Sequence, residues 1–469
     1  MAQPTRREFV AGAAAGLALP ALARAATRSP WADAAAVVAG IRQPRFPDRD
    51  IRVTDHGAKG DGRTLASGAF ARAIAACVAA GGGRVVVPPG RYLTGPIRLR
   101  SNVNLHLAEG ATLLFSTDPA HYPLVHTRWE GMELLNFSPL VYAYRERNVA
   151  ITGKGTLDGQ ADGRHWWPWK GKWRGTVDNG WRAGAPNQLP ARQRLLDMVA
   201  RGAPLAERRF GAGAYLRPPL IQPYGCDTVL IEGVRLRRAP FWQVHPVLCR
   251  NVTVRGLDIL GHGPNNDGCD PESCDGVLIE RNVFDTGDDC IAIKSGRNND
   301  GRRFAAPSRN IVIRDCRMKQ GHAGVAIGSE ISGGVNRVFA ERCRMDSPDL
   351  HFALRFKNNA MRGGDLERLY FRDITVGEVA EAAIFCDFHY EEGANGPYTP
   401  ILRDVMVERM HVARALRVLD AEGLPNAPIE RLTIRDSRFD TVARPSVVRN
   451  VEGLVLDDVV VGGRRIEAL

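Results

Sequence analysis

Acidic side chains are concentrated in residues 264–296, PNNDGCDPESCDGVLIERNVFDTGDDCIAIKSG. They include Asp267, Asp270, Glu272, Asp275, Asp285, Asp288 and Asp289. The run GVLIERNVF between the acidic turns is typical of a β-strand. Adjacent carboxylates such as Asp288 and Asp289 repel each other, so a chain that gathers several of them usually holds a proton, a metal or an electropositive ligand there. This segment is therefore the candidate catalytic region.

A strand-like phrase that recurs along the chain predicts how these residues are positioned. Its copies include SNVNLHL at 101, RNVAITG at 147, RNVTVRGLDI at 250, RNIVIRDCRM at 309 and EGLVLDDVVV at 452. From position 227 onward the copies begin 22 to 36 residues apart. One strand–turn–strand unit per period of this length indicates a β-solenoid. A propeller would need a longer, more regular repeat, and a sandwich would need hairpin turns. The sequence predicts an all-β, right-handed parallel β-helix.

The N-terminal part of the chain departs from this repeat. Residues 1–25 carry Arg6-Arg7, an apolar run and a small-residue cleavage site, as expected of a twin-arginine signal peptide. Residues 26–49 are interpreted as a linker, and residues 50–469 as the β-helix domain. Residues 68–80 have helical spacing and predict a helix that caps the N-terminal end of the solenoid. A tryptophan-rich insertion spans about 160–217, where a groove wall and a satellite hydrophobic cluster are both open interpretations.

Charge and cysteine content narrow the class of protein. The formal charge is +11, but the chain has no helix-turn-helix, RNA-recognition or zinc-finger pattern, so an acidic polymer is a better partner than nucleic acid. No apolar run approaches the roughly 18 residues of a membrane span. The nine cysteines form no zinc motif. Cys269 and Cys274 could form a disulfide bridge, whereas Cys290, Cys316 and Cys343 lie in or beside apolar strands and are expected to be buried thiols. We expect an exported protein, periplasmic or secreted, whose oligomeric state the sequence does not give.

On a parallel β-helix, residues at equivalent places in successive coils lie about 4.8 Å apart. When the coils are aligned by their opening strands, the turns that follow those strands fall in roughly one column. The side chains at these places are Asp267, Asp288, Asp289, His322, Arg355 and Lys357. Clustered carboxyl groups raise the pKa of at least one member, so one can donate a proton while another activates water, as glycoside hydrolysis requires. The cationic pair Arg355 and Lys357 could hold a substrate carboxylate.

Four short motifs, in order, resemble those of the polygalacturonase family, family 28 of the glycoside hydrolases. They are Asn265-Asn266-Asp267, Gly287-Asp288-Asp289-Cys290, Gly321-His322-Ala323-Gly324 and Arg355-Phe356-Lys357, which stand for the family's NTD, DD, GHG and RIK. The departures at Asn266, Ala323 and Phe356 leave every acid, base and cation in place.

The resemblance covers residues 51–469 and implies a pectin-lyase-like solenoid that hydrolyses α-1,4-galacturonide bonds with inversion and without a cofactor or metal. By analogy, Asp288 is the general acid, Asp267 and Asp289 activate water, His322 supports the acid, and the Arg355–Lys357 pair grips a galacturonate carboxylate.

Residues 127–144 and 241–249 are similar to bacterial exo-acting members of this family. An insertion that closes one end of the groove would restrict cleavage to the non-reducing end. Further candidate substrate contacts are Asn265, Lys294, Trp129, Trp242, His245 and Tyr390. Structural packing is the alternative interpretation for Trp242 and Tyr390, and a hydrogen-bonded strand histidine for His245.

Three alternatives to polygalacturonan hydrolysis follow from the same residues. A polysaccharide lyase would use the acids to bind Ca²⁺ and would give an unsaturated product. A non-catalytic carbohydrate-binding solenoid would break the acid column with neutral residues, and here the column is continuous. A rhamnogalacturonan or xylogalacturonan substrate also agrees with a uronate-binding cationic pair.

Overall fold

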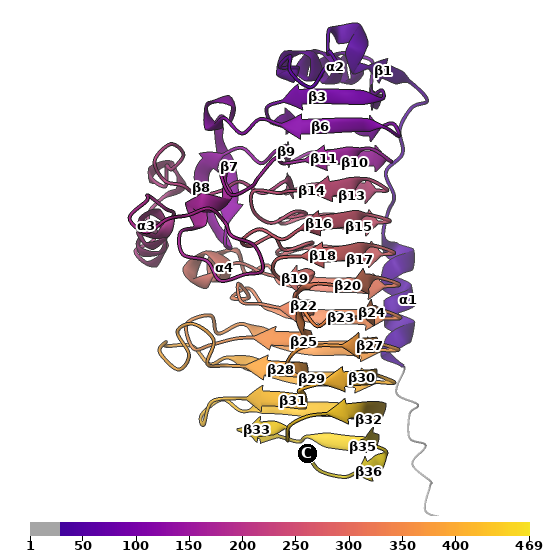
Figure 1. Ribbon diagram of the computed structural model, residues 1–469, viewed down its shortest axis with the longest axis vertical. Coiled ribbons are helices and arrows are strands. Elements are labelled where there is room, and N and C mark those ends of the chain that lie inside the picture. Colours follow the sequence, from indigo (N-terminus) through magenta and orange to yellow (C-terminus); the bar gives the residue numbers. More distant parts are fainter. Residues whose placement is uncertain (1–28) are drawn as a thin grey trace, which may run out of the picture.

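The recurring strands pair in parallel, each with the equivalent strand one coil away. Val252 in β15 (Arg250–Arg255) lies opposite Val277 in β17 (Asp275–Glu280), which lies opposite Ile311 in β20 (Ser308–Arg314). The computed structural model describes residues 29–469, and it shows these coils stacked into one long solenoid (Figure 1). The predicted right-handed parallel β-helix is confirmed.

Each coil contributes strands to a large sheet that bends around the solenoid and to a second sheet that completes the turn. The remaining strands of the large sheet are β1 (Asp50–Arg52), β2 (Gly83–Val87), β3 (Gly90–Thr94), β5 (Val103–Leu107), β6 (Ala111–Phe115), β10 (Arg147–Gly153), β11 (Thr156–Asp158), β13 (Asp227–Glu232), β14 (Arg235–Arg237), β16 (Asp258–Gly261), β18 (Val283–Thr286), β21 (Arg317–Met318), β23 (Val335–Glu341), β24 (Arg344–Met345), β26 (Asp365–Arg372), β27 (Thr375–Glu378), β29 (Ile401–Glu408), β30 (His411–Ala415), β32 (Ile429–Val442), β34 (Val451–Glu452), β35 (Val455–Val461) and β36 (Arg464–Ile466).

The second sheet carries the candidate site on its outer face. Its strands are β19 (Ile291–Ile293), β22 (Gly321–Ile327), β25 (Leu350–Lys357), β28 (Ala382–Asp387), β31 (Arg417–Glu422) and β33 (Val447–Arg449). Nearer the N-terminus its place is taken by β4 (Ile97–Arg98), β9 (Val141–Tyr144) and β12 (Ile221–Tyr224), and β7 (Leu124–Trp129) with β8 (Met132–Phe137) forms a separate hairpin.

The core consists of inward-facing side chains that stack from coil to coil. One continuous row of register partners comprises Val252, Val277, Ile311, Val338, Leu369, Val405 and Leu432. All of them are buried. Burying such a side chain contributes about 1.5–3 kcal/mol, so apolar rows stabilise the coils against sliding past one another. All nine cysteines are buried and free, and the bridge considered between Cys269 and Cys274 does not form.

Helix α2 (Ser67–Ala79) covers the N-terminal end of the solenoid, as predicted for residues 68–80 (Figure 1). Its apolar face packs into the main core through Phe70, Ala73, Ile74 and Cys77. The helix therefore covers the apolar end of the first coil, which would otherwise face water.

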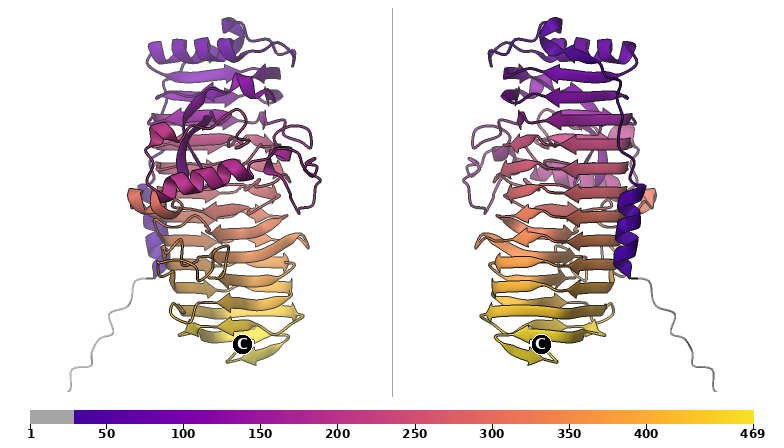
Figure 2. Two further views of the ribbon diagram at one scale, coloured as in Figure 1. Left: turned by 90° about the vertical axis from the view of Figure 1, so that its left-hand side faces the viewer. Right: turned by 90° about the vertical axis from the view of Figure 1, so that its right-hand side faces the viewer.

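The interpretation of residues 26–49 as a linker does not hold for residues 30–40, which form helix α1 (Pro30–Gly40). The Trp31 indole packs against Phe339 at 6.1 Å between ring centroids, and its Nε1 donates a hydrogen bond to Glu408 at 2.7 Å. The Arg372 guanidinium lies 4.0 Å from the centroid of the same indole. From α1 the chain runs along the outside of the coils to β1 (Figure 2). Proline and alanine suggested a linker, but Pro30 at the start of a helix and Ser29 as its N-cap are helix-start signals.

Two further helices lie outside the coils. Helix α3 (Leu189–Ala200) belongs to the tryptophan-rich insertion, and α4 (Asn298–Phe304) follows β19. The described chain also contains short 3-10 helices: η1 (Val53–His56), η2 (Pro119–His121), η3 (Trp167–Lys170) and η4 (Leu205–Glu207). The β7–β8 hairpin, α3 and α4 project from one side of the solenoid (Figure 1). In the described part of the chain, no helix is long and apolar enough to span a membrane.

We predict that Trp31→Ala lowers the free energy of unfolding by about 3 kcal/mol, because it removes a buried aromatic side chain and leaves Glu408 without its indole donor. Chemical denaturation would measure this change. The control is Leu65→Ala, whose side chain is exposed and which should change stability by less than about 0.5 kcal/mol. Equal stability of the two variants would show that α1 contributes nothing to the fold.

Candidate active site

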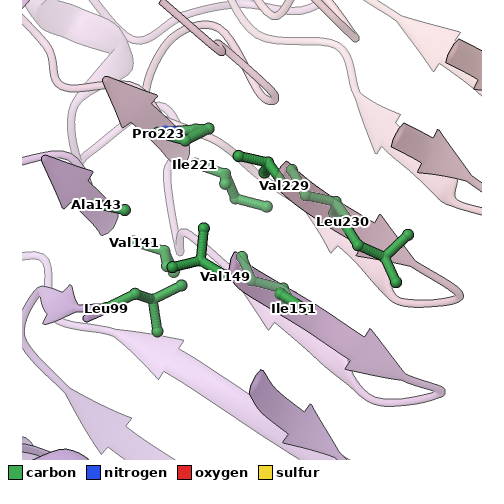
Figure 3. Close-up of a pocket in the computed structure, with 11 residues that line it drawn as sticks. Leu99, Val141, Ala143, Val149, Ile151, Ile221, Pro223, Val229 and Leu230 are labelled. Carbon is green, nitrogen blue, oxygen red and sulfur yellow. The ribbon is translucent and has the colours of Figure 1, made fainter. Parts of the chain in front are cut away.

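A polar cavity of about 290 Å³ opens on the outer face of the second sheet, beside the protruding insertion. Its lining residues are Glu130, Lys170, Leu189, Arg192, Trp242, Asn265, Asp267, Asp288, Asp289, Lys294, Arg297, Ser329, Glu330, Lys357, Tyr390 and Glu391. A second cavity, lined only by apolar residues that include Leu99, Ile221 and Val229, lies among the coils nearer the N-terminus (Figure 3). Its side chains are all apolar and offer no acid or base, whereas the first cavity holds the predicted acids Asp267, Asp288 and Asp289 and is the candidate site.

The parallel register places Asp288 beside His322. Ile291 pairs with Val325 in the next coil. Asp288 and His322 each lie three residues before these partners, and His322 Nδ1 is 2.8 Å from Asp288 Oδ1. Burial by itself raises the pKa of Asp288, but the adjacent His322 and the cations Lys357 and Lys294 lower it below its usual range. The Asp288 charge in turn raises the pKa of His322. The pair is therefore a carboxylate with an imidazolium.

Asp289 is buried and faces the two predicted cations. Lys357 Nζ donates to Asp289 Oδ2 at 2.8 Å, and Arg355 Nη1 lies 3.7 Å from Asp289 Oδ1. Arg355 and Lys357 are alternate residues of β25, so both project from the same face of the sheet. Asp289 Oδ1 has no hydrogen-bond partner within the described chain and remains available as an acceptor.

Asp267 forms a third group with Asp270 and Lys294. Lys294 Nζ lies 3.8 Å from Asp267 Oδ2, 3.6 Å from Asp270 Oδ1 and 3.1 Å from Glu330 Oε2. Burial, together with the charges of Asp288 and Asp270, raises the pKa of Asp267 well above its usual range, and burial does the same to Asp270. Within the carboxyl cluster, a proton is therefore held most tightly by Asp267 and Asp270.

The structure brings all six residues of the predicted column to one side of the second sheet, although not to a single register position. Arg355 lies within a strand, opposite Ala326, whereas the acids lie next to the strand ends. The six side chains are therefore spread over several residue positions along the strand direction. Asn265 donates to Asp288 Oδ2 at 3.4 Å and also lines the cavity. Tyr390 lies above the cationic pair, its ring centroid 5.8 Å from the Arg355 guanidinium and 5.5 Å from Lys357 Nζ.

Trp242 both faces the cavity and packs against other aromatic rings, so the substrate-contact and the packing interpretations apply to the same side chain. Its indole lines the cavity, and Lys294 Nζ lies 4.4 Å from the ring centroid. The same ring packs against Phe241 at 4.9 Å. A flat aromatic wall above a cation is suited to a sugar ring that carries a carboxylate.

The assignment of His245 as a substrate contact is wrong. Its side chain is fully buried, with Nε2 2.8 Å from Glu272 Oε2 and Nδ1 3.0 Å from the Gln222 amide. Trp129 is also buried, stacked on Phe241 at 5.5 Å, and does not line the cavity. Both side chains are buried, and the sequence alone does not distinguish a side chain that supports a site from one that faces it.

Several residues of the site were not among the predicted site residues. Asp270 belongs to the acidic segment and contacts Lys294 without lining the cavity. The lining residues that were not predicted come from segments outside the repeat: Glu130, Lys170, Leu189, Arg192, Arg297, Ser329, Glu330 and Glu391. They have no place in the strand pattern, so only the fold brings them to the cavity.

Ion pairs join the two walls of the cavity at one end. Arg192 of α3 pairs with Glu130 at 2.7 Å and with Glu391, which follows β28, at 3.2 Å. Glu391 also accepts from Arg297 at 2.7 Å. The insertion on one side is thus connected to the loops on the other, and the cavity is bounded there rather than open along the sheet.

The donor set does not fit the Ca²⁺ that a lyase would need. One oxygen of Asp288, one of Asp289 and a nitrogen of His322 lie within 4.8 Å of one another. Ca²⁺ takes six to eight oxygen ligands, whereas this group contains an imidazole nitrogen, and Lys357 and Arg355 already lie against Asp289. The arrangement suits proton transfer and anion binding.

We predict that Asp288→Asn lowers the pKa of His322, because the Asp288 carboxylate makes the largest contribution to its rise. Titration of the His322 imidazole by NMR would measure it. In the parent protein the raised His322 pKa contributes stability that is complete below about pH 6.5 and is lost as pH rises through the raised value. An unchanged His322 pKa in Asp288→Asn would contradict this ion pair.

Comparison with known proteins agrees with this geometry. The profile of "Glycosyl hydrolases family 28" matches residues 212–412, and that of "Rhamnogalacturonase A/epimerase, pectate lyase-like" matches residues 51–107. The crystal structure of an exopolygalacturonase from Thermotoga maritima has 43% sequence identity and a TM-score of 0.90, over 94% of this chain and 98% of that one.

Curated relatives are more distant. A probable polygalacturonase of Vitis vinifera is 29% identical over 429 residues, which is 86% of this chain and 77% of the relative. An exo-poly-alpha-D-galacturonosidase of Dickeya chrysanthemi is 28% identical over 75% of this chain, and the match spans 59% of that enzyme's length.

Proposed function

Because the chain belongs to family 28 of the glycosyl hydrolases, we propose that it hydrolyses α-1,4-galacturonide bonds of polygalacturonate or its oligomers, from the non-reducing end. One observation carries the proposal: three carboxyl groups, an imidazolium and two cations that bind Asp289 share one face at a polar cavity that ion pairs close at one end. The carboxyl groups supply acid and base, and the cations supply a site for a uronate.

In this proposal the Asp288–His322 pair is the proton donor. The pair holds one transferable proton, which resides on His322 because Asp288 is kept ionised. The proton on His322 Nδ1 passes across the 2.8 Å hydrogen bond to Asp288, and Asp288 delivers it to the glycosidic oxygen and is again a carboxylate. The bond to the leaving sugar breaks, and the imidazole becomes neutral.

Water would be positioned by Asp289 and Asp267 on the opposite side of the sugar, with Asp289 as the base, because Asp267 holds its own proton tightly. Asp289 retains an unbonded oxygen that can accept a proton from water, and Asp267 lies beside Lys294. Attack from that face inverts the anomeric centre. Lys357 and Arg355, next to Asp289, would bind the carboxylate of the sugar on one side of the scissile bond.

Exo action is supported by the closed end of the cavity. The ion pairs from Arg192 of α3 to Glu130 and Glu391 lie at one end of the cavity, where they would stop a polysaccharide chain from continuing. The structure from Thermotoga maritima is described as an exopolygalacturonase, and the Dickeya relative is named for the same mode of action. A chain end can enter such a cavity, whereas a chain interior cannot.

The test is a time course of polygalacturonate digestion with separation of the products. Galacturonate monomer from the earliest time point is the expected result. A ladder of oligomers would overturn exo action, and no new reducing ends would remove galacturonan as substrate. A product absorbing in the ultraviolet, lost on addition of a chelator, would indicate a lyase instead.

A rhamnogalacturonan-type substrate is the second candidate, because the profile named for rhamnogalacturonase matches residues 51–107. That segment forms the capped N-terminal coils and contributes no residue to the cavity lining. Faster release of sugars from rhamnogalacturonan than from polygalacturonate would favour it.

We predict that Asp288→Asn loses turnover by about a thousandfold or more while the protein stays folded, because an amide cannot relay the proton. Reducing-end assays and circular dichroism measure the two effects. The matched control is Asp285→Asn, in the same acidic segment but paired with His262 at 2.7 Å and outside the cavity lining. Near-normal turnover in Asp288→Asn would reassign the acid.

We also propose export by the twin-arginine route to the periplasm or beyond, where pectin of plant cell walls would be encountered. The support is the sequence of residues 1–25, which lie outside the described residues. Replacement of Arg6 and Arg7 by lysine should retain the protein in the cytoplasm in a cell-fractionation experiment. Unchanged export would remove this assignment.

A further inference from the structure

Among the described residues, one cation that lines the cavity has no acid within ion-pair distance. Each of the other lysines and arginines in the lining has a carboxylate partner: Lys294 with Glu330 at 3.1 Å, Lys357 with Asp289 at 2.8 Å, Arg192 with Glu130 at 2.7 Å and Arg297 with Glu391 at 2.7 Å. Lys170 also lines the cavity, yet over residues 29–469 its ammonium has neither an ion pair within 4.0 Å nor a hydrogen bond. Its charge is available to a ligand.

The insertion holds Lys170 firmly in this place. It is the last residue of η3, whose Trp169 packs edge-on against the buried Trp166 at 4.8 Å. The carbonyl of Trp169, just before Lys170, accepts from Gln188 N at 2.8 Å, and the carbonyl of Gly171, just after it, accepts from the Asn179 side-chain amide at 2.9 Å. The tryptophan-rich segment thus acts as a rigid support for a side chain at the cavity.

Burial without a partner is unfavourable for an ammonium group. Burial lowers the pKa of Lys170, an effect that the nearby charge of Glu130 opposes. A chain that places an unpaired lysine in a polar cavity gains nothing in stability from it. A bound anion would supply the missing partner and form a charge-assisted hydrogen bond.

The proposed substrate requires a second carboxylate-binding group. A bond between two galacturonates has one carboxylate on each side, and the pair Arg355 and Lys357 can serve only one of them. Lys294 is already committed to Asp267, Asp270 and Glu330. Lys170 shares the cavity wall with Trp242 and with Glu130 and Arg192 of the closed end. We propose that Lys170 binds the carboxylate of the terminal, non-reducing galacturonate and selects for its negative charge; this inference rests on the proposed function.

The test compares two substrates in the full-length enzyme: trigalacturonate and the same trimer whose non-reducing-end carboxyl is a methyl ester. The parent enzyme should prefer the free acid. Lys170→Met should lower kcat/KM for trigalacturonate by about tenfold or more, mainly through KM, and change the rate on the ester little. Lys170→Arg should retain part of the preference. The control is Lys172→Met, an exposed lysine of the same insertion that does not line the cavity.

Thermal unfolding distinguishes a loss of substrate binding from a loss of protein stability. Because Lys170 forms no ion pair that its replacement would break, we expect Lys170→Met to be at least as stable as the parent. A Lys170→Met enzyme that still prefers the acid by the parent's ratio would overturn the inference. A parent enzyme that is active on trigalacturonate but does not distinguish it from the ester would also overturn it. A parent enzyme that releases no galacturonate from either trimer would instead refute the proposed function.

Discussion

The fixed parallel register between coils is the constraint on which the site depends. Backbone hydrogen bonds hold equivalent residues of neighbouring coils about 4.8 Å apart, so acids at the same turn of successive coils cannot move away from one another. Asp288 therefore lies beside His322, and Asp267 near Asp288 and Asp270. Their mutual repulsion is offset by the cations Lys294 and Lys357, which are held by the same register.

The same register accounts for much of the arginine on the outer surface. Arginines of one coil pair with acids of the coil before, as in Arg309 with Asp275 at 2.9 Å, Arg403 with Glu367 at 2.9 Å and Arg431 with Asp404 at 2.7 Å. Each exposed pair contributes little alone, about 0–1 kcal/mol. The high arginine content is thus partly a feature of coil stacking, whereas the charges that recognise substrate are few and lie in the cavity.

The repeat made the solenoid, the capping helix and the acid cluster predictable, because each depends on local pattern and on one spacing shared by every coil. The cavity wall was not predictable in this way. Arg192 and Glu391 are 199 residues apart in sequence and belong to irregular segments, so no period relates them. His245 shows the opposite limit: the sequence offered a hydrogen-bonded strand histidine as the alternative, but the residue lies outside the named strands, and only packing reveals that Glu272 and Gln222 enclose it.

Helix α1 gives the N-terminal segment a role in the order of events during synthesis. Trp31 is among the first described residues to leave the ribosome, but its hydrogen-bond acceptor Glu408 is made 377 residues later. The helix cannot reach its native contacts until nearly the whole stack of coils has been translated. Docking of α1 therefore completes only after the coils that it contacts have formed.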